Sequence, residues 1–343
     1  MNLKELSEFL GLSQTTVSRA LNGYPEVAEA TRERVMKAAR QHHYTPNPRA
    51  RSLATGRSHA VGHILPLSAE HEMLNPVFTD FLAGAAEVYA RESYDMLLSL
   101  VPDRDEAGSY RRIAARGSVD GVIVHGPTVD DPRIGLLREI GMPFVVHGRS
   151  GGAGETEYCW VDINNARAFE RATRLLLELG HRRIGLLNGL ETMDFAHERR
   201  TGYRKALRDA GIAEDPALCR ASEMTEGYGF AAATDLLALA DPPTALLASS
   251  ILIGFGARRA LDAAGLRIGR DVSLVVHDDE LSYLRNGKVE PIFTATRSSV
   301  RQAGRICAEL LLGQIAVPAL PPQHVLLEAE LIIGDTTGPA PAP

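Results

Sequence analysis

Apolar residues recur every three to four positions in three short segments near the start of the chain, which predicts three amphipathic helices. The first covers LKELSEFL, residues 3–10, and Gly11 after it can adopt the left-handed conformation that ends a helix. Ser13 is a suitable N-cap for the second helix. The third helix is expected at 29–42. Its expected inward side chains are Val35, Met36 and Ala39.

The second helix has a polar outer side. Val17, Ala20 and Leu21 share one face, and the opposite stripe is polar. Two helices joined by a glycine turn and closed by a third make a helix-turn-helix unit. Arg can donate twice to guanine, Gln can pair with adenine, and a Thr methyl can touch thymine. A solvated helix face is the alternative, but the turn, the cap and the third helix favour DNA. The predicted DNA contacts are Ser13, Gln14, Thr15, Thr16, Ser18, Arg19 and Asn22.

A proline-containing segment connects this predicted DNA-binding domain, residues 1–46, to the rest of the chain. Asn47 is a possible N-cap and Pro48 suits the first helical position, so residues 47–57 are expected to form a short hinge helix. A helix this short is marginal alone, and a linker that is helical only when held can act as a switch. Leu53 can wedge between base pairs in a minor groove. The alternative is a flexible linker with Leu53 docked on a neighbouring domain.

Beyond residue 58, short apolar strands alternate with helical patterns such as FTDFLAGAAEVYARE. Strands are predicted at AVGHILPL, YDMLLSLV, DGVIVHG and MPFVVHG, and a second series at RRIGLLNG, TALLAS and VSLVVHD. This alternation is typical of parallel sheets covered by helices on both faces. The predicted fold class is therefore α/β, with a three-helix domain followed by two doubly wound lobes. Ligands of such sheets bind beyond the carboxyl ends of the strands, so we expect a site between the lobes.

Charge is unevenly distributed along the 343 residues. Residues 1–58 carry a net charge of +4 and the remainder −10, which gives −6 for the chain. A basic head on an acidic body suggests that only the head meets a polyanion. The three cysteines show no metal-ligand spacing, and the chain shows neither a signal peptide nor a membrane-spanning apolar run. We expect a cytoplasmic protein, located at the nucleoid when it binds DNA, with no cofactor and no membrane partner.

Several motifs together resemble the lactose-repressor/galactose-repressor family of bacterial transcription regulators. They are SQTTVSRALNG, EATRERV, YTPNPRARSLATG and VGHILP, and in the body LLELGHRRIGLL, ERRTGYRKAL and DVSLVVHDDE. The resemblance implies a homodimer, in most cases a repressor, that binds a near-palindromic operator. By position, Gln14, Thr15 and Arg19 match the family's base-reading residues, and Leu53 matches its minor-groove wedge. The hinge residues expected to reach DNA are Asn47, Ala50, Arg51 and Leu53.

The resemblance also implies that residues 58–343 form a periplasmic-binding-protein-like body for effector binding and dimerisation. Crossings between the lobes are expected near residues 161, 291 and 318. Lobe 1 is then expected at about 58–160 and 292–318, and lobe 2 at about 161–291 and 319–336. A small molecule between the lobes would change how the two copies of lobe 1 pack, and so change operator affinity.

Loops after the predicted strands carry polar and aromatic residues suited to a hydroxyl-rich ligand. Phe78, Arg199 and Asp278 match positions where the family holds its effector, often a sugar. Ser249, Met224 and His147 stand where the family often has Asn, an aromatic residue and Asp. The stretches VVHGRS, VDINN and ETMDFAHERR are similar to regulators of α-glucoside utilisation, which favours a glucoside-type disaccharide. The expected effector-binding residues are Phe78, His147, Asn164, Arg199, Met224, Ser249 and Asp278.

Two other function classes fit less well. A transport-type sugar-binding protein should carry a secretory signal and lack a basic head. An enzyme acting on a sugar or nucleotide needs a positioned acid–base pair or an activated nucleophile. GRSGG (148–152) lacks the helix of a nucleophile elbow, and GYGFAA (227–232) lacks the preceding strand of a dinucleotide fingerprint. The HDD run at 277–279 has no second cluster to complete a metal site. We predict a regulator without catalytic or metal-binding residues.

Overall fold

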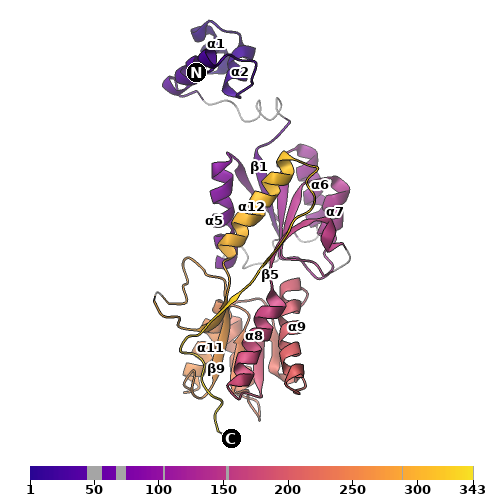
Figure 1. Ribbon diagram of the computed structural model, residues 1–343, viewed down its shortest axis with the longest axis vertical. Coiled ribbons are helices and arrows are strands. Elements are labelled where there is room, and N and C mark those ends of the chain that lie inside the picture. The colour runs from indigo at the N-terminus through magenta and orange to yellow at the C-terminus, as the bar shows by residue number, and fades with distance from the viewer. Residues whose placement is uncertain (45–55, 67–74, 103–104, 152–153, 288, 343) are drawn as a thin grey trace.

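The computed structural model describes residues 1–44, 56–66, 75–102, 105–151, 154–287 and 289–342. The predicted hinge contacts Asn47, Ala50, Arg51 and Leu53 lie outside these ranges. Figure 1 shows a small helical head at one end of an elongated molecule, followed by two α/β lobes along the long axis.

Three helices form the head: α1 (Leu3–Leu10), α2 (Gln14–Leu21) and α3 (Glu29–Gln41). Gly11 has a φ of 63° and ends α1, as predicted. Ser13 caps α2, because its hydroxyl accepts the backbone N–H of Thr16 at 3.0 Å. Leu6, Val17 and Val35 are fully buried and pack together, so each helix contributes an apolar side chain to one small core.

The inward face of α3 differs from the prediction at one position. Val35 and Ala39 are buried as expected, but Met36 is 40% exposed and Ala38 is buried in its place. Each residue of an α-helix turns the side chain by about 100°, so a helix that directs Val35 inward turns Met36 toward the edge of the buried face. The prediction for Met36 was therefore wrong.

Lobe 1 contains a six-stranded sheet in the order β11-β5-β4-β3-β1-β2, in which all the neighbouring strands are parallel. Figure 1 shows α5 and α12 beside one another and α6 and α7 on the other side of the sheet. Its strands are β1 (Ala60–Pro66), β2 (Asp95–Val101), β3 (Gly121–His125), β4 (Phe144–His147), β5 (Cys159–Ile163) and β11 (His324–Leu327). Its helices are α5 (Pro76–Arg91), α6 (Glu106–Arg116), α7 (Pro132–Ile140) and α12 (Val300–Ala316).

Lobe 2 repeats this architecture with the sheet order β12-β10-β9-β8-β6-β7, in which only β12 is antiparallel to its neighbour. Its strands are β6 (Ile184–Asn188), β7 (Cys219–Ala221), β8 (Ala245–Ala248), β9 (Ser273–Asp278), β10 (Thr294–Arg297) and β12 (Glu330–Ile332). Its helices are α8 (Asn165–Glu178), α9 (Asp194–Asp209), α10 (Glu226–Leu237) and α11 (Ile251–Ala263). The short 3₁₀ helices are η3 (Glu155–Glu157) and η4 (Pro216–Leu218).

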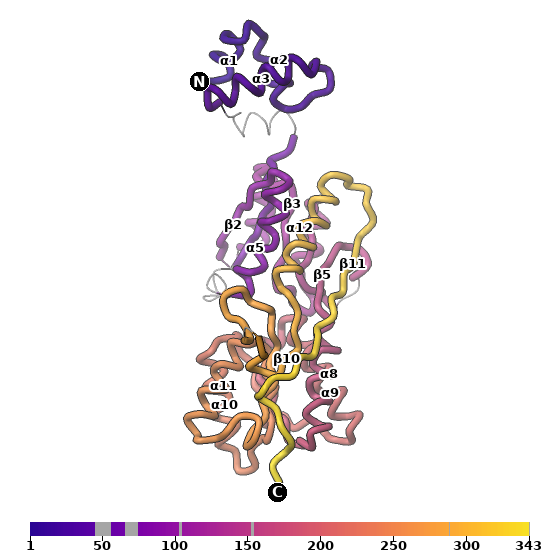
Figure 2. Tube along the Cα trace, turned by 60° about the vertical axis from the view of Figure 1, so that its left-hand side comes forward, coloured from indigo at the N-terminus to yellow at the C-terminus, as the bar shows by residue number. Residues whose placement is uncertain are grey.

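The chain crosses between the lobes after β5, after β10 and after β11. Figure 2 shows the last crossing, where the chain returns from α12 and β11 to the lower lobe. Each crossing lies further along the chain than the predicted positions near 161, 291 and 318. The reason is that residues 294–297 pair with β9 in lobe 2, whereas residues 324–327 pair with β5 in lobe 1. These four-residue strands carry no apolar pattern that reveals their partner sheet.

Helices α5 and α12 approach closely on one face of lobe 1. A Cβ atom at Gly304 would lie 2.2 Å from the carbonyl oxygen of Phe81, and one at Gly84 would lie 2.0 Å from that of Arg301. Only glycine fits at such distances, so this pair of glycines sets the separation of the two helices. Both helices also carry side chains into the space between the lobes. None of the helices in the described residues is long and apolar enough to cross a membrane.

Candidate DNA-binding face and interlobe cavity

Some side chains in the polar stripe of α2 form hydrogen bonds within the head, and the others do not. Ser13 and Thr16 are joined by a 2.8 Å hydrogen bond between their hydroxyls, and Asn22 donates to the carbonyl of Ser18 at 2.9 Å. Gln14, Thr15 and Arg19 are exposed. Ser13, Thr16 and Asn22 thus stabilise the ends of the helix, which leaves three exposed side chains with the chemistry of base readout.

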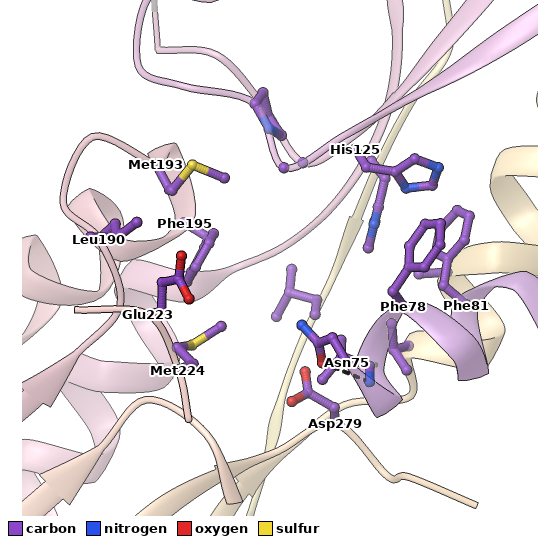
Figure 3. A pocket seen from close by; sticks show the side chains of 18 of the residues that line it. Asn75, Phe78, Phe81, His125, Leu190, Met193, Phe195, Glu223, Met224 and Asp279 are labelled. Atoms are coloured by element: carbon purple, nitrogen blue, oxygen red, sulfur yellow. Dashed lines mark hydrogen bonds between the residues drawn. The ribbon is translucent and has the colours of Figure 1, made fainter. Parts of the chain in front are cut away.

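A cavity of about 960 Å³ lies between the two lobes. Figure 3 shows Phe78, Phe81 and His125 of lobe 1 across an open space from Met193, Phe195 and Met224 of lobe 2. Most of its lining is apolar or aromatic, and a few charged side chains reach it. This combination of an apolar wall and a few convergent polar groups is typical of a small-molecule site.

Four of the seven predicted effector-binding residues line the cavity. They are Phe78, His147, Arg199 and Met224. Asn164, Ser249 and Asp278 do not line it. Asn164 caps α8 through the N–H of Arg167, Ser249 binds Asn188 through its hydroxyl at 2.7 Å, and Asp278 accepts the N–H of Glu280 at 2.9 Å.

The next residue lines the cavity in two of these three cases. Asn165 lies beside Asn164 and Asp279 beside Asp278, and both face the cavity. Successive side chains point to opposite sides at the end of β9, and each residue turns the side chain by about 100° at the start of α8. An error of one residue at either place therefore moves a side chain from the cavity into the structure behind it. The sequence placed acidic and amide groups at the correct loops, but neither composition nor spacing shows which member of each pair faces inward.

Arg199 is the most deeply buried cation of the cavity wall, with 5% of its surface exposed. Its Nε donates to Asn165 Oδ1 at 2.8 Å and one terminal nitrogen donates to the carbonyl of Ser249. The other terminal nitrogen forms no hydrogen bond with any of the described residues. Burial lowers the pKa of Arg199 to about 10, and the charge of Asp279 opposes that shift. The guanidinium therefore remains charged and keeps donors for a ligand.

Asp279 supplies the opposite charge. Burial alone raises its pKa, but hydrogen bonding from His277 and the positive charge of Arg199 bring the pKa below its ordinary value. Asp279 is thus an ionised acceptor at the cavity wall. His147, which also lines the cavity, is neutral because burial lowers its pKa to about 4.

Direct contacts join the lobes around this cavity. The N–H of Asp194 in lobe 2 donates to the carbonyl of Pro127 at 3.0 Å, and the N–H of Gly151 in lobe 1 donates to Asp194 Oδ1 at 3.0 Å. Asp80 on α5 accepts both the backbone N–H and the hydroxyl of Ser282 in lobe 2, at 2.7 and 2.6 Å. A ligand that changed the angle between the lobes would have to alter these contacts.

Comparisons with known proteins connect the head and the body to one family. The profile of "Bacterial regulatory proteins, lacI family" matches residues 2–47, and that of the "Periplasmic binding protein-like domain" matches residues 173–337. The HTH-type transcriptional regulator AglR of Rhizobium meliloti (strain 1021) is 45% identical over 341 residues, which cover 99% of this chain and 95% of AglR. The chain belongs to the lacI family of bacterial regulatory proteins. It is a helix-turn-helix transcriptional regulator that binds DNA, and not an enzyme.

A second relative matches along nearly its full length, and a solved structure of a regulator with the same name is also similar to this chain. The regulator is 32% identical over 334 residues to the HTH-type transcriptional regulator CelR of Thermobifida fusca. The matched region covers 97% of each chain. The structure titled "transcriptional regulator CelR-cellobiose complex" has a TM-score of 0.73, 30% identity, and covers 97% of the regulator and 99% of that chain. These relatives confirm the predicted fold class, a helix-turn-helix domain followed by a two-lobed periplasmic-binding-protein-like body.

Proposed function

We propose that this regulator controls transcription by binding operator DNA as a homodimer, and that a disaccharide of the α-glucoside type between its lobes sets operator affinity. The effector acts by binding one arrangement of the lobes better than another, since only a difference in affinity can shift that equilibrium. Repression is the expected outcome of operator binding. Such a protein works in the cytoplasm, where the nucleoid lies.

One observation carries the sugar assignment: Arg199 and Asp279 present a fixed donor and a fixed acceptor in a cavity with aromatic walls. Sugars combine hydroxyl groups, which need both donors and acceptors, with apolar ring faces that pack on aromatic side chains such as Phe78. The volume of about 960 Å³ is near the upper end of the roughly 300–1,000 Å³ typical of ligand pockets, so the cavity admits more than one sugar ring. The CelR structure, whose title names cellobiose, supports a disaccharide.

The exposed face of α2 supports the proposed base readout. Gln14, Thr15 and Arg19 are exposed on one helix whose other polar residues hold its ends. We assign base contacts to these three, helix-end and phosphate contacts to Ser13, Thr16, Ser18 and Asn22, and minor-groove contacts to the hinge residues Asn47, Ala50, Arg51 and Leu53. A dimer presents two such heads and therefore favours a near-palindromic operator.

The experiment uses the full-length protein and an operator selected from random duplexes. Fluorescence anisotropy measures operator affinity with and without maltose as the α-linked probe, cellobiose as the β-linked probe and glucose as the size control. We expect sequence-selective binding in every case, and a change in operator affinity with maltose that exceeds the changes with cellobiose and glucose. An equal response to all three sugars, or none, would refute the α-glucoside assignment. Absence of sequence preference would refute operator binding itself.

A further inference from the structure

One carboxylate holds the short segment through which the chain enters lobe 1 from the head. Residues 56–59, the linker base, directly precede β1, and Figure 1 shows the chain entering lobe 1 there, at the end nearest the head. Asp120 is the residue before β3. Its Oδ1 accepts the backbone N–H of Ser58 at 2.6 Å and the Ser58 hydroxyl at 2.9 Å, and its Oδ2 accepts the N–H of His59 at 2.9 Å. Both oxygens of one side chain therefore hold two consecutive residues of the linker base.

The backbone held by Asp120 has a conformation that needs outside support. His59 has a φ of 53°, which lies in the left-handed region that residues other than glycine rarely adopt. Its carbonyl accepts the N–H of Asp95, the first residue of β2, at 2.8 Å. Hydrogen bonds to an ionised acceptor are roughly twice as strong as neutral ones. The carboxylate of Asp120 therefore stabilises a shape of the linker base that the local sequence does not favour by itself.

A further hydrogen bond joins the linker base to α12. One terminal nitrogen of Arg57 donates to the carbonyl of Ile315 at 3.0 Å. Ile315 lies in the last turn of α12, where carbonyls lack partners within the helix and attract a cation. The first turn of α12 reaches the cavity through Val300 and Ala303, and β1 reaches it through Leu65. The linker base is thus attached to elements of lobe 1 whose other ends lie at the cavity.

We propose that Asp120 is a positioning residue that fixes the direction in which the chain leaves lobe 1 toward the head. Because the linker base is bonded to the starts of β2 and β3 and to the end of α12, it moves with lobe 1 as one body. A change in how lobe 1 sits in a dimer then changes the spacing of the two heads. Without the Asp120 hydrogen bonds, the linker base can turn about Ala60, and the change does not reach the DNA. This inference rests on the proposed function, because it names a residue through which operator binding is controlled.

The Asp120→Asn variant keeps the size of the side chain but cannot make the same hydrogen bonds. An amide has one oxygen and one NH₂ group, so in either orientation the NH₂ group faces a backbone N–H of Ser58 or His59 that needs an acceptor. The held conformation then loses a hydrogen bond to a charged group, which weakens it by about tenfold or more. Asp95→Asn is the matched control, because the Asp95 side chain is exposed and its backbone N–H still binds His59.

The spacing of the operator half-sites tests the direction of the linkers without any sugar. One base pair inserted at the centre of the selected operator separates the half-sites by about 3.4 Å more and rotates them by about 35°. In anisotropy titrations, the full-length natural protein and Asp95→Asn should prefer the unmodified operator by about tenfold or more. Asp120→Asn should bind the two operators with nearly equal affinity. Its maltose affinity in calorimetry should be unchanged, because Asp120 does not line the cavity, but maltose should alter its operator affinity less.

Hydrogen–deuterium exchange tests the same hydrogen bonds without DNA. Peptides that cover residues 56–60 should be protected in the natural protein and exchange about tenfold faster in Asp120→Asn. Rapid exchange in the natural protein, or an unchanged spacing preference in Asp120→Asn, would overturn the inference.

Two further outcomes remain decisive. If Asp120→Asn does not fold, Ser58→Ala removes only the hydroxyl bond and should reduce the spacing preference by a smaller factor; an unchanged preference in Ser58→Ala would then overturn the inference. If the natural protein binds no operator selectively, the proposed function fails, whereas the exchange rates still decide whether Asp120 holds the linker base. A lack of response to maltose would affect only the sugar assignment, because the spacing test uses no sugar.

Discussion

Two neighbouring carboxylates at the end of β9 should respond differently to the same substitution. Asp279 lines the cavity beside Arg199, whereas Asp278 accepts the backbone N–H of Glu280. We expect Asp279→Asn to weaken sugar binding and the resulting change in operator affinity. Asp278→Asn should leave both unchanged, because an amide oxygen can still accept from Glu280.

The size of the effect follows from the charge that is lost. Hydrogen bonds to charged groups contribute about 1.5–3 kcal/mol and neutral ones about 0.5–1.5 kcal/mol, so exchanging carboxylate for amide removes about 1–1.5 kcal/mol per bond. A carboxylate that accepts two sugar hydroxyls then loses about 2–3 kcal/mol. Binding of maltose by Asp279→Asn should therefore weaken by about 30- to 150-fold.

Calorimetry with maltose and operator anisotropy measure the two consequences on the same preparations. Asp278→Asn also serves as a folding control: burial raises the pKa of Asp278 to about 6, so ionisation opposes folding at higher pH, and the amide should unfold no more easily at about pH 8. Unchanged maltose affinity in Asp279→Asn would refute the proposed role of this carboxylate. A loss of maltose affinity in Asp278→Asn alone would show that Asp278, and not Asp279, binds the sugar.

Three further predictions concern the head, the helix packing and pH. Arg19→Ala should flatten base preference at one operator position by about 1–3 kcal/mol; a uniform loss across all sequences in a selection assay would contradict base readout. Gly304→Ala should lower the free energy of unfolding by about 1–3 kcal/mol in urea melts, whereas Gly313→Ala on the same helix, where a Cβ meets nothing closer than 3.9 Å, should not. Burial, helped by Asp162, raises the pKa of Asp194 to about 7, and opening the lobes would let it fall. The arrangement described here, in which Asp194 contacts Pro127 and Gly151, therefore binds the proton more tightly. A sugar that favours this arrangement should bind less tightly as pH rises from about 5 to 8, and maltose calorimetry measures this; the same decrease in Asp194→Asn would exclude this carboxyl as its source.

Local signals with a definite physical cause were predictable from the sequence. Gly11 ends α1 because it tolerates a positive φ, and Ser13 caps α2 because its oxygen reaches the N–H of Thr16. The alternation of strands and helices predicted two parallel sheets, since an apolar strand between amphipathic helices must be covered on both faces. The run GYGFAA lies within α10, as its helical pattern indicated.

Features that depend on the three-dimensional partner were not predictable. The strands at 294–297 and 324–327 are too short to show which sheet they join. Whether Asp278 or Asp279 faces the cavity depends on the rotation of the chain where β9 ends, and both are buried. The buried contacts that join Tyr89 to His63 and His63 to His125 were also missed, because these residues lie on three separate elements, α5, β1 and β3. The signal in the sequence was a histidine in each of the strands β1, β3 and β4.

The three chain segments that cross between the lobes connect them in parallel, like a hinge. Two of them leave the adjacent strands β5 and β11, and the third follows β10, which pairs with the strand that receives the returning chain. Three short connections side by side resist sliding and separation but permit bending about one axis. A ligand in the cavity can therefore change little except the angle between the two lobes. In a dimer, a change of that angle would alter the spacing of the two heads.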